Sequence, residues 1–508
     1  MIRKDSMLER APDSEAMLQY WDLTDTLVDG IEALRLAGEK YLPRFPAEGS
    51  ENYKFRLKQT TVMTNIFADI VESLSVKPFE RETILTGTDV PQEMRDFSED
   101  VDGSGNNLSV FSSGVFYNSV KSGIDWIFID YPTIDPTIRT LADSRAAGVR
   151  PFWSHVLGRN VLEVRSRFIR SKEELIYVRI YEPGKVDHVR VMERTPEGQI
   201  VWTLYVKTDI WDKERETFFQ PIDAGVMTID EIPLVPFMTG RRDGKTFKFD
   251  PPLRAAADLQ VHLYRQESGL NYATTLTAYP MLTGNGVKPD RDESGNVKQI
   301  PVGPNCVLYA PPNADGTVGS WRYVEPSSNS LTFLSNYIKE IILNLRELGR
   351  QPLTASSSNL TTVTTAFAAG KSKSSVKAWA IQLKDALENA FRITAKWMGT
   401  DYQATVSVYT EFDEFVDGKD YDALRAARDK NDISRETYWE ECKRRGLFSE
   451  EFNAEREEAR LLAELPGDGP DMNLDNAPNV VYIDDNSDDG NHDGRNHDNN
   501  NDRRQVNV

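Results

Sequence analysis

Two apolar ladders near the C-terminal third dominate the hydrophobic pattern of this chain. Apolar positions recur every three or four residues in both, which places each set on one face of a helix. The first ladder consists of Leu331, Leu334, Ile338, Ile341, Leu345 and Leu348. The second consists of Val376, Ala380, Leu383, Leu387, Ala390, Thr394 and Trp397. The small polar stretch TASSSNLTTVTT at 354–365 separates them, so the pattern predicts two long helices that present a loop.

Upstream of the ladders, the pattern predicts helices followed by strands. Helical spacing over residues 15–80 includes one expected helix at 53–74, and a shorter helix fits 110–123. β-branched and aromatic stretches then predict strands, joined by Pro-Gly turns into an antiparallel sheet with one solvated face. The expected strands are at 124–131, 175–182, 186–194, 200–207 and 232–238.

A turn-rich module lies between two expected rods. Pro251 and Pro252 suit the first turn of a long helix that runs to about residue 278, before Pro280. Residues 280–326 are rich in Gly, Pro, Asn and Asp, and short strands fit 306–309 and 321–324. The first ladder follows, so we expect the two rods to run antiparallel.

The C-terminal part is expected to hold one strand, a helical set and a tail. The strand fits 404–412, and the helices fit 421–465, with Ser434 and Ser449 as N-cap candidates. Residues 467–508 carry many Asp, Asn and Gly and are expected to be disordered.

Composition limits the class of protein. A chain of 508 residues is expected to form two to four domains. Its apolar stretches are short and its mean hydropathy is −0.51, so no membrane span is expected. Cys306 and Cys442 stand far apart and predict neither a disulfide framework nor a metal site.

The charge balance is acidic, because 80 Asp and Glu against 60 Lys and Arg give a formal net charge of −20. A protein that grips nucleic acid needs a basic surface. This chain therefore either does not touch nucleic acid or meets it without binding it tightly.

One set of basic residues stands at the expected start of the second ladder helix. It is either a solvated helix face or a group of charges that face phosphates. Its members are Lys371, Lys373, Lys377 and Lys384.

Motifs for catalysis are weak. Gly244-Lys245-Thr246 and Gly370-Lys371-Ser372 resemble the end of a phosphate-binding loop, but Thr239 and Thr365 stand where the first glycine is required. The histidines His155, His188 and His262 are scattered and are interpreted as packing or surface residues. We therefore expect no catalytic, cofactor-binding or metal-binding residues.

Several stretches, in this order, resemble the portal (head-to-tail connector) proteins of tailed phages, including a portal-like phage family first catalogued without a function. They are YLPRFPAE at 41–48, RLKQTTVMTNIFADIVESL at 56–74, IPLVPFMTG at 232–240, DPPLRAAADLQVHLYRQESGLNYA at 250–273 and LRAARDKNDISRETYWEECKRRGLFSEEFNAEREEARL at 424–461. The resemblance covers most of residues 15–465.

The resemblance implies an α+β portal fold. Its expected parts are a wing of N-terminal helices and an antiparallel sheet at 1–250, stem helix 1 at 251–279, a clip at 280–326, stem helix 2 at 327–350, a tunnel loop at 351–370, a long helix and core strand at 371–415, helical crown at 416–465 and an acidic disordered tail at 466–508.

It also implies a ring of twelve copies at one capsid vertex, through which double-stranded DNA is packaged and ejected without sequence-specific binding. The terminase, which supplies the ATPase, and a head-tail adaptor would dock at the clip, and the major capsid protein would surround the ring. The implied location is the virion, with assembly in the host cytoplasm. The implied tunnel-loop residues are Thr354, Ser356, Ser357, Ser358, Asn359, Thr361 and Thr362, and the clip candidates are Asp290, Arg291, Asp315 and Trp321.

Acidic walls suit a conduit, because they repel phosphates while a few lysines steer the duplex. Two alternatives stay open: a minor capsid-associated scaffold protein without a channel, and an enzyme of unknown class that works in a cleft of the wing.

Overall fold

The chain combines helices and strands in an α+β fold, as predicted. The computed structural model describes residues 5–87, 89–132, 148–277, 281–287, 318–324, 328–349, 362–410, 418–430 and 432–444, and residues 291, 295, 316, 412, 452, 454, 456–458 and 460. Two compact units, Met1–Phe412 and Asp413–Val508, divide the chain. The expected wing, stem, clip and long helix all fall within the first unit. Among the described helices, none is long and apolar enough to cross a membrane.

Six helices form the N-terminal part: α1 (Pro12–Asp29), α2 (Ile31–Ala37), α3 (Ser50–Phe55), α4 (Ile66–Ser75), α5 (Gln92–Glu99) and α6 (Leu108–Ser122). Helix α6 confirms the helix predicted at 110–123. The Asn107 side chain caps its first turn by accepting from Val110 N, and Gly123 ends it in the left-handed conformation with φ 89°. Short helical turns precede α1, at η1 (Ser6–Leu8), and follow α2 and α4, at η2 (Gly38–Lys40) and η4 (Lys77–Phe79). A further short turn, η5 (Gly158–Asn160), lies between two later strands.

The single helix predicted at 53–74 is wrong, because the chain is interrupted in its middle. Helix α3 continues into a π-helix, η3 (Arg56–Thr60), and residues 61–65 leave the helix before α4 begins. These residues read TVMTN, and their β-branched side chains have low helix propensity. Their backbone groups bond instead to α8 (Arg254–Thr277). The buried Gln260 side chain donates to Thr64 O (2.9 Å) and accepts from Phe67 N (3.0 Å).

Two antiparallel sheets follow. The larger has the strand order β4 (Val161–Ile169), β5 (Lys172–Glu182), β6 (His188–Arg194), β7 (Ile200–Asp212) and β8 (Thr217–Val226). Its three central strands confirm the strands predicted at 175–182, 186–194 and 200–207, although β7 is longer than predicted. The smaller sheet has the order β3 (Phe152–Leu157), β2 (Ile124–Asp130) and β9 (Leu234–Met238).

The two edge strands and β3 were not predicted. Strand β4 alternates charged residues with apolar ones, and β8 contains Pro221 and Gly225, so neither has the composition of a central strand. Strand β2 is buried along nearly its whole length, because α6 and α10 (Thr362–Met398) both contact it. Its almost continuous apolar sequence is typical of a strand that does not face solvent.

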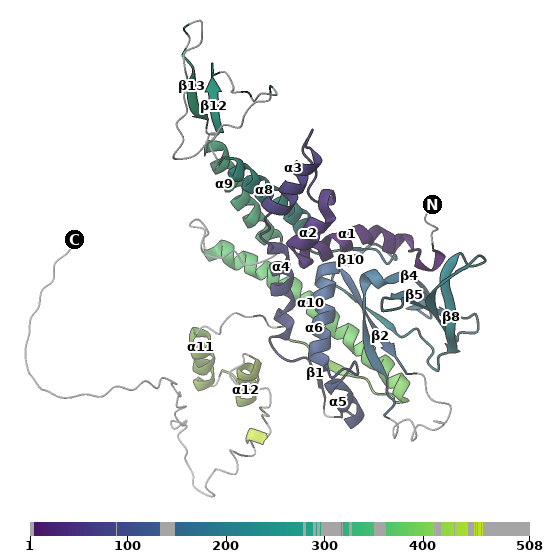
Figure 1. Ribbon diagram of the computed structural model, residues 1–508. Helices are drawn as coiled ribbons and strands as arrows, with labels where there is room; N and C mark the ends of the chain where they lie inside the picture. Colours follow the sequence, from purple (N-terminus) through teal and green to yellow (C-terminus); the bar gives the residue numbers. More distant parts are fainter. Residues whose placement is uncertain are drawn as a thin grey trace, which may run out of the picture. The chain divides into compact units, whose positions relative to one another are not determined.

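Helices α8 and α9 (Ser328–Leu348) lie side by side and confirm the two rods predicted on either side of the turn-rich module (Figure 1). They run antiparallel, because early α8 and late α9 both contact α4. Gln260 bonds to Phe67 N, while Arg346 lies 3.5 Å from Asp69. Between them in sequence, β12 (Met281–Asn285) pairs with β13 (Ser320–Val324). The strand predicted at 306–309 lies outside the described residues.

Helix α10 has 37 residues and contains the second ladder. Every ladder position from Val376 to Thr394 is fully buried. The tunnel loop predicted at 351–370 is therefore too long, because residues 362–370 already belong to α10. Ala366, Ala368 and Ala369 favour helix there and offset the cost of Gly370.

The strand predicted at 404–412 is longer than the observed strand, β14 (Thr405–Ser407), which pairs with β1 (Ile84–Thr86).

An apolar core of buried side chains runs through the described part of the first unit. One part of it is an aromatic group in which Trp153 makes edge contacts with Phe97 and Phe391 at 5.5 and 4.8 Å between ring centroids. The Trp153 Nε1 group donates to Thr394 Oγ1 at 2.9 Å, so the one polar ladder position of α10 is satisfied inside the core. Two short strands, β10 (Arg241–Arg242) and β11 (Phe249–Asp250), lead into α8.

The second unit contains α11 (Gly418–Asp429) and α12 (Arg435–Arg444). Ser434 accepts from Thr437 N at 3.1 Å, which confirms it as the N-cap of α12. Its fellow candidate Ser449 and the expected tail lie outside the described residues. Cys442 is buried in this unit.

Replacing Gln260 by leucine tests the junction between α8 and the interrupted helix. Leucine has a similar volume but cannot bond to Thr64 O or to the buried Phe67 N, so both backbone groups would lose this partner. We expect Gln260→Leu to lower the free energy of unfolding by about 2–4 kcal/mol, measured by urea unfolding. The exposed Gln59→Leu is the control and should change it by less than about 0.5 kcal/mol. Equal effects of both substitutions would contradict this account.

Candidate functional site

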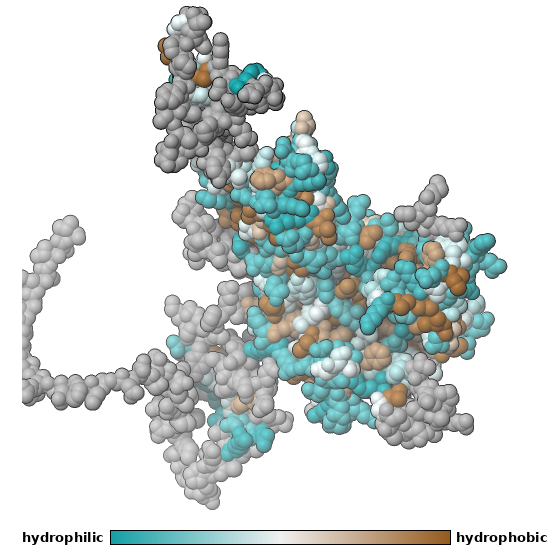
Figure 2. All heavy atoms as spheres, viewed as in Figure 1, coloured by the Kyte–Doolittle hydropathy of each residue, from teal (hydrophilic) through white to brown (hydrophobic). Residues whose placement is uncertain are grey.

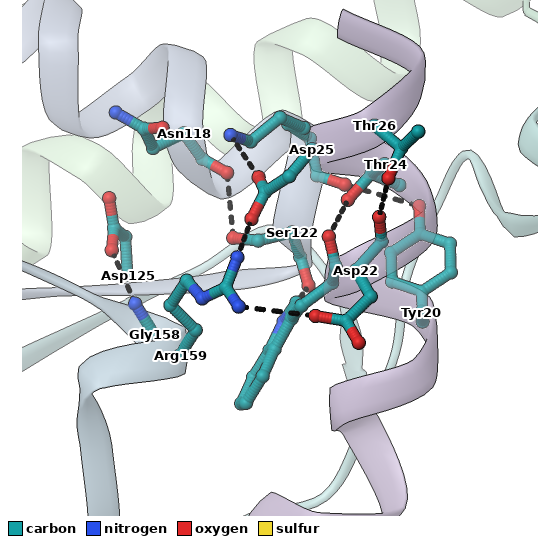
Figure 3. Close-up of polar contacts among 12 residues, drawn as sticks. Tyr20, Asp22, Thr24, Asp25, Thr26, Asn118, Ser122, Asp125, Gly158 and Arg159 are labelled. Carbon is teal, nitrogen blue, oxygen red and sulfur yellow. Dashed lines mark hydrogen bonds and ion pairs between the residues drawn. The ribbon is translucent and has the colours of Figure 1, made fainter. Parts of the chain in front are cut away.

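A cluster of charged side chains joins α1, α6 and η5 (Figure 3). Lys121 Nζ lies 2.7 Å from Asp25 Oδ1, and Arg159 contacts both Asp25 and Asp22, with 3.1 Å between Nη2 and Asp22 Oδ1. Lys40 lies 3.7 Å from Asp22. Each charge thus has an opposite partner, and the cavity beside the cluster has a volume of only about 20 Å³. This arrangement holds α1, α6, η5 and η2 together and leaves space for little more than a water molecule.

A buried Asp–His pair lies next to this cluster. Asp125 is fully buried, contacts His155 Nε2 through Oδ2, and accepts from Gly158 N at 2.9 Å through Oδ1. Burial raises the pKa of Asp125, against the lowering effect of the His155 contact. The nearby Ser122 hydroxyl lies 2.6 Å from Asn118 O and 2.7 Å from Ile124 O, both backbone carbonyls. Without a serine–histidine hydrogen bond, the group lacks the contact that activates a nucleophile.

The phosphate-loop fragments do not have the required context. Gly244-Lys245-Thr246 lies in the turn between β10 and β11, and Gly370-Lys371-Ser372 lies inside α10. A phosphate-binding loop connects a strand to the start of a helix, so neither fits. Within the described ranges, no three His, Cys, Asp or Glu residues gather where they could hold a metal ion.

A cleft of about 280 Å³ lies where β2 ends, between the larger sheet and the end of α10. Aromatic rings of Tyr131, Trp202 and Trp397 contribute to its walls, together with Arg190. The Arg190 guanidinium already bonds to Glu182 (2.7 Å) and lies 3.4 Å from Asp130. The cleft walls therefore combine aromatic rings with a cation that is already paired.

The α8–α9 pair is attached to α4 and exposes part of its apolar surface. Of the first ladder, Ile338, Ile341 and Leu345 are buried, whereas Leu348 is 44% exposed. His262 of α8 contacts the Tyr337 hydroxyl of α9 at 3.1 Å. The pair is held at its base, and its flanks carry exposed side chains that the body does not cover.

The clip candidates are only partly described. Trp321 is half-buried, and its ring lies over Gly284 on the facing strand, where an added Cβ would lie 2.9 Å from the ring. It therefore packs across the hairpin. Arg291 is exposed and donates to Gly295 O at 2.6 Å. The exposed Arg322 next to Trp321 was not singled out from the sequence. Asp290 and Asp315 lie outside the described residues.

The basic set lies within α10, not at its start. Lys377 is exposed and has no ion pair among the described residues. Lys384, seven residues later on the same face, pairs with Glu388 at 3.7 Å. The side chains of Lys371 and Lys373 are outside the described part, although both residues are helical. Thr362 is the first residue of α10, and the other loop candidates lie outside the described residues: Thr354, Ser356, Ser357, Ser358, Asn359 and Thr361.

Near its C-terminal end, α10 is fixed by a carboxylate clamp that sequence analysis missed. Glu231 accepts two hydrogen bonds from Arg392, at 2.5 and 2.7 Å, and one from Lys396 at 2.5 Å. Lys396 also bonds to Asp230 at 2.8 Å. Burial raises the pKa of Glu231, but the hydrogen bonds from Arg392 and Lys396 outweigh it and lower the pKa to about 2. The partners are about 160 residues apart in sequence, and no spacing pattern could reveal them.

Residues 252–398 match the family described as "Domain of unknown function (DUF4055)". The matched segment starts just before α8 and ends with α10, and it includes the β12–β13 hairpin and α9. No curated protein matches the chain.

Among solved structures, a chain from the "Neck of native GTA particle computed with C12 symmetry" is similar, with 12% identity and a TM-score of 0.37 over 85% of this chain and 98% of that chain. A chain from the "Neck of empty GTA particle computed with C6 symmetry" has 12% identity and a TM-score of 0.38, over 83% of this chain and 95% of that one. One from the "Virion of native gene transfer agent (GTA) particle" has 12% identity and a TM-score of 0.36, over 85% and 98%.

The clamp on α10 predicts a pH-dependent stability. The lowered pKa means that Glu231 stabilises the folded state above its unfolded pKa, near 4.5, and that this contribution is lost as the pH falls toward 2. We expect Glu231→Gln to lower the melting temperature by about 2 °C at pH 7, and by progressively less between pH 4.5 and 3. Differential scanning calorimetry measures both. Exposed Glu214→Gln is the control, and a Glu231→Gln deficit that stayed constant down to pH 3 would argue against the clamp.

Proposed function

We propose that this chain is the portal protein of a tailed phage or phage-like particle, and that copies of it form a ring around a channel for double-stranded DNA. The observation that carries the proposal is the succession of α8, the β12–β13 hairpin, α9 and α10 within one compact unit. Two antiparallel rods with a hairpin module between them in sequence, followed by a long buried helix, correspond to the stem, clip and long helix that the sequence resemblance implies. The sheet-containing N-terminal part supplies the wing.

The charges on α10 suit contact with a passing polyanion. Its buried ladder faces the body, while Lys377, next to the ladder residue Val376, is exposed. Glu388 partly neutralises Lys384, so Lys377 is the stronger candidate for contact with phosphates. In a chain with a net charge of −20, isolated lysines attract the duplex only locally and do not hold it.

The β12–β13 hairpin is the proposed docking surface for the terminase and, later, for the head-tail adaptor. Trp321 packs over Gly284 and stiffens the hairpin, while Arg291 and Arg322 are the exposed groups available to a partner. The proposed role is structural, because the described polar clusters pair off among themselves. The major capsid protein would surround the ring in the virion. A scaffold protein without a channel is the alternative that the absence of rings would favour.

The proposal predicts closed rings of the purified chain. Twelve copies of the 57.6 kDa chain have a mass of about 690 kDa, and mass photometry should detect this species. Negative-stain images should show rings with a central hole. A chain that stays monomeric at micromolar concentration, and is absent as a ring from particles, would contradict the proposal.

A second prediction concerns the segment between α9 and α10, where Ser357 and Ser358 lie outside the described residues. If this segment borders the channel, replacing both serines by tryptophan narrows the passage. We expect packaged DNA per particle to fall at least about tenfold while ring formation is unchanged, because DNA transit requires a channel wider than the duplex. Quantitative PCR of nuclease-treated particles measures it. Ser104→Trp in an exposed wing loop is the control, and normal packaging by the double variant would remove this segment from the channel.

A further inference from the structure

Two sets of exposed apolar side chains lie on α9 and on the segment from α2 to residue 62. The α9 stripe comprises Phe333, Tyr337 and Leu348, and the N-terminal patch comprises Leu36, Phe45, Phe55 and Val62. Phe333 is 70% exposed and Phe55 is 51% exposed. Apolar side chains reach the surface in the region of α3 (Figure 2). Grouped apolar side chains on a soluble surface mark an interaction site.

The α9 stripe is ordered before any partner binds. Its residues follow one another at helical spacing and lie beside the ladder residues that α9 buries. The rings of Phe333 and Tyr337 are nearly parallel, with 4° between their planes and 6.5 Å between centroids. Glu340 lies one heptad after Phe333, on nearly the same face, and it is exposed without an ion pair in the described part of the chain. The stripe is thus an apolar surface with an uncompensated negative charge.

The N-terminal patch is also held firmly. Arg56 is buried under the Phe45 ring, 4.2 Å from its centroid, and donates to both oxygens of Glu48 at 2.9 and 2.7 Å. The Phe45 ring also lies 6.4 Å from that of Tyr272 on α8. Beside Phe55, Lys58 is exposed and has no ion pair among the described residues. This patch therefore pairs an apolar surface with an uncompensated positive charge.

Helix α8 separates the two surfaces (Figure 1). It contacts α9 through His262, and it contacts the N-terminal segment through Arg265 and Asn271, which donate to Tyr41 O (2.7 Å) and Thr60 O (2.9 Å). The stripe and the patch thus lie on two flanks of one rigid assembly. A two-fold dimer would need one patch that complements itself, whereas a head-to-tail contact joins two different patches and can close into a ring.

We infer that the α9 stripe of one copy packs against the N-terminal patch of the next copy, with Glu340 facing Lys58. This inference rests on the proposed ring, and it names the surfaces that the ring buries. Each copy then covers both of its exposed apolar sets, and the two uncompensated charges neutralise each other. Such a contact repeats unchanged around the ring, because every copy offers one stripe and one patch.

Charge reversal tests the pairing. Glu340→Lys and Lys58→Glu each place like charges opposite each other, and we expect each to raise the concentration needed for half-maximal ring formation at least about tenfold at low salt. The double variant restores the opposite charges and should recover most of the loss. Glu197→Lys and Lys185→Glu, both exposed in turns that join strands of the larger sheet, are the controls. Mass photometry gives the ring fraction, and circular dichroism shows that each variant is folded.

Cross-linking tests the contact independently of the charges. In a background with Cys306→Ser and Cys442→Ala, chains with Phe333→Cys are mixed with chains carrying Phe55→Cys, and a short bis-maleimide is added to the reassembled rings. We expect covalent dimers between the two kinds of chain, and none when Phe168→Cys, on exposed β4, replaces Phe55→Cys. Wild-type rings with neither cross-links nor sensitivity to charge reversal would overturn this inference and leave the portal proposal standing. Absence of wild-type rings would overturn the portal proposal itself.

Discussion

The arrangement of the first unit depends on one buried side chain that replaces missing backbone hydrogen bonds. At the break between η3 and α4, the Gln260 side chain of α8 supplies both a donor and an acceptor to backbone groups that have no helical partner. Buried peptide groups without partners are costly, so the interruption and α8 require each other. Because α9 packs on α8, this junction also determines where the α8–α9 pair leaves the body.

Helix α10 is positioned by a different kind of interaction at its other end. Its ladder buries apolar side chains, which determines its rotation about its own axis, while the Glu231 clamp with Arg392 and Lys396 determines its position along that axis. Apolar contacts alone tolerate sliding more readily than bidentate hydrogen bonds, which have a defined geometry. The proposed stem and the long helix are thus attached to the same body by independent means.

Long periodic segments were predictable from the sequence, and local interruptions were not. The ladders, the rod that begins after Pro252 and the central strands all have patterns that tertiary contacts reinforce. The break at residues 61–65 follows from Gln260, almost 200 residues away, so the local pattern predicted one continuous helix. The early start of α10 was missed because threonines and serines were read as loop, although the alanines among them favour helix.

At the candidate site, too, the sequence predicted the features that follow from helical periodicity but not the contacts between distant residues. The exposure of Lys377 and its spacing from Lys384 follow from helical periodicity, but the ion pair that restrains Lys384 needed the structure. Trp321 was expected as a docking residue, yet its ring lies against Gly284 of the facing strand. The Glu231 clamp and the two apolar surfaces on either flank of α8 arise from residues that are distant in sequence, and only their placement in space connects them.

The burial of α10 has a mechanical consequence. Its described ladder begins at Val376, and the Glu231 clamp holds the helix at Arg392 and Lys396. Val376 lies sixteen residues before Arg392, a distance of about 24 Å along the helix, so a tilt of about 5° at the clamp would displace Val376 by about 2 Å. A small rearrangement at the Glu231 end would thus become a larger displacement at the far end of the ladder.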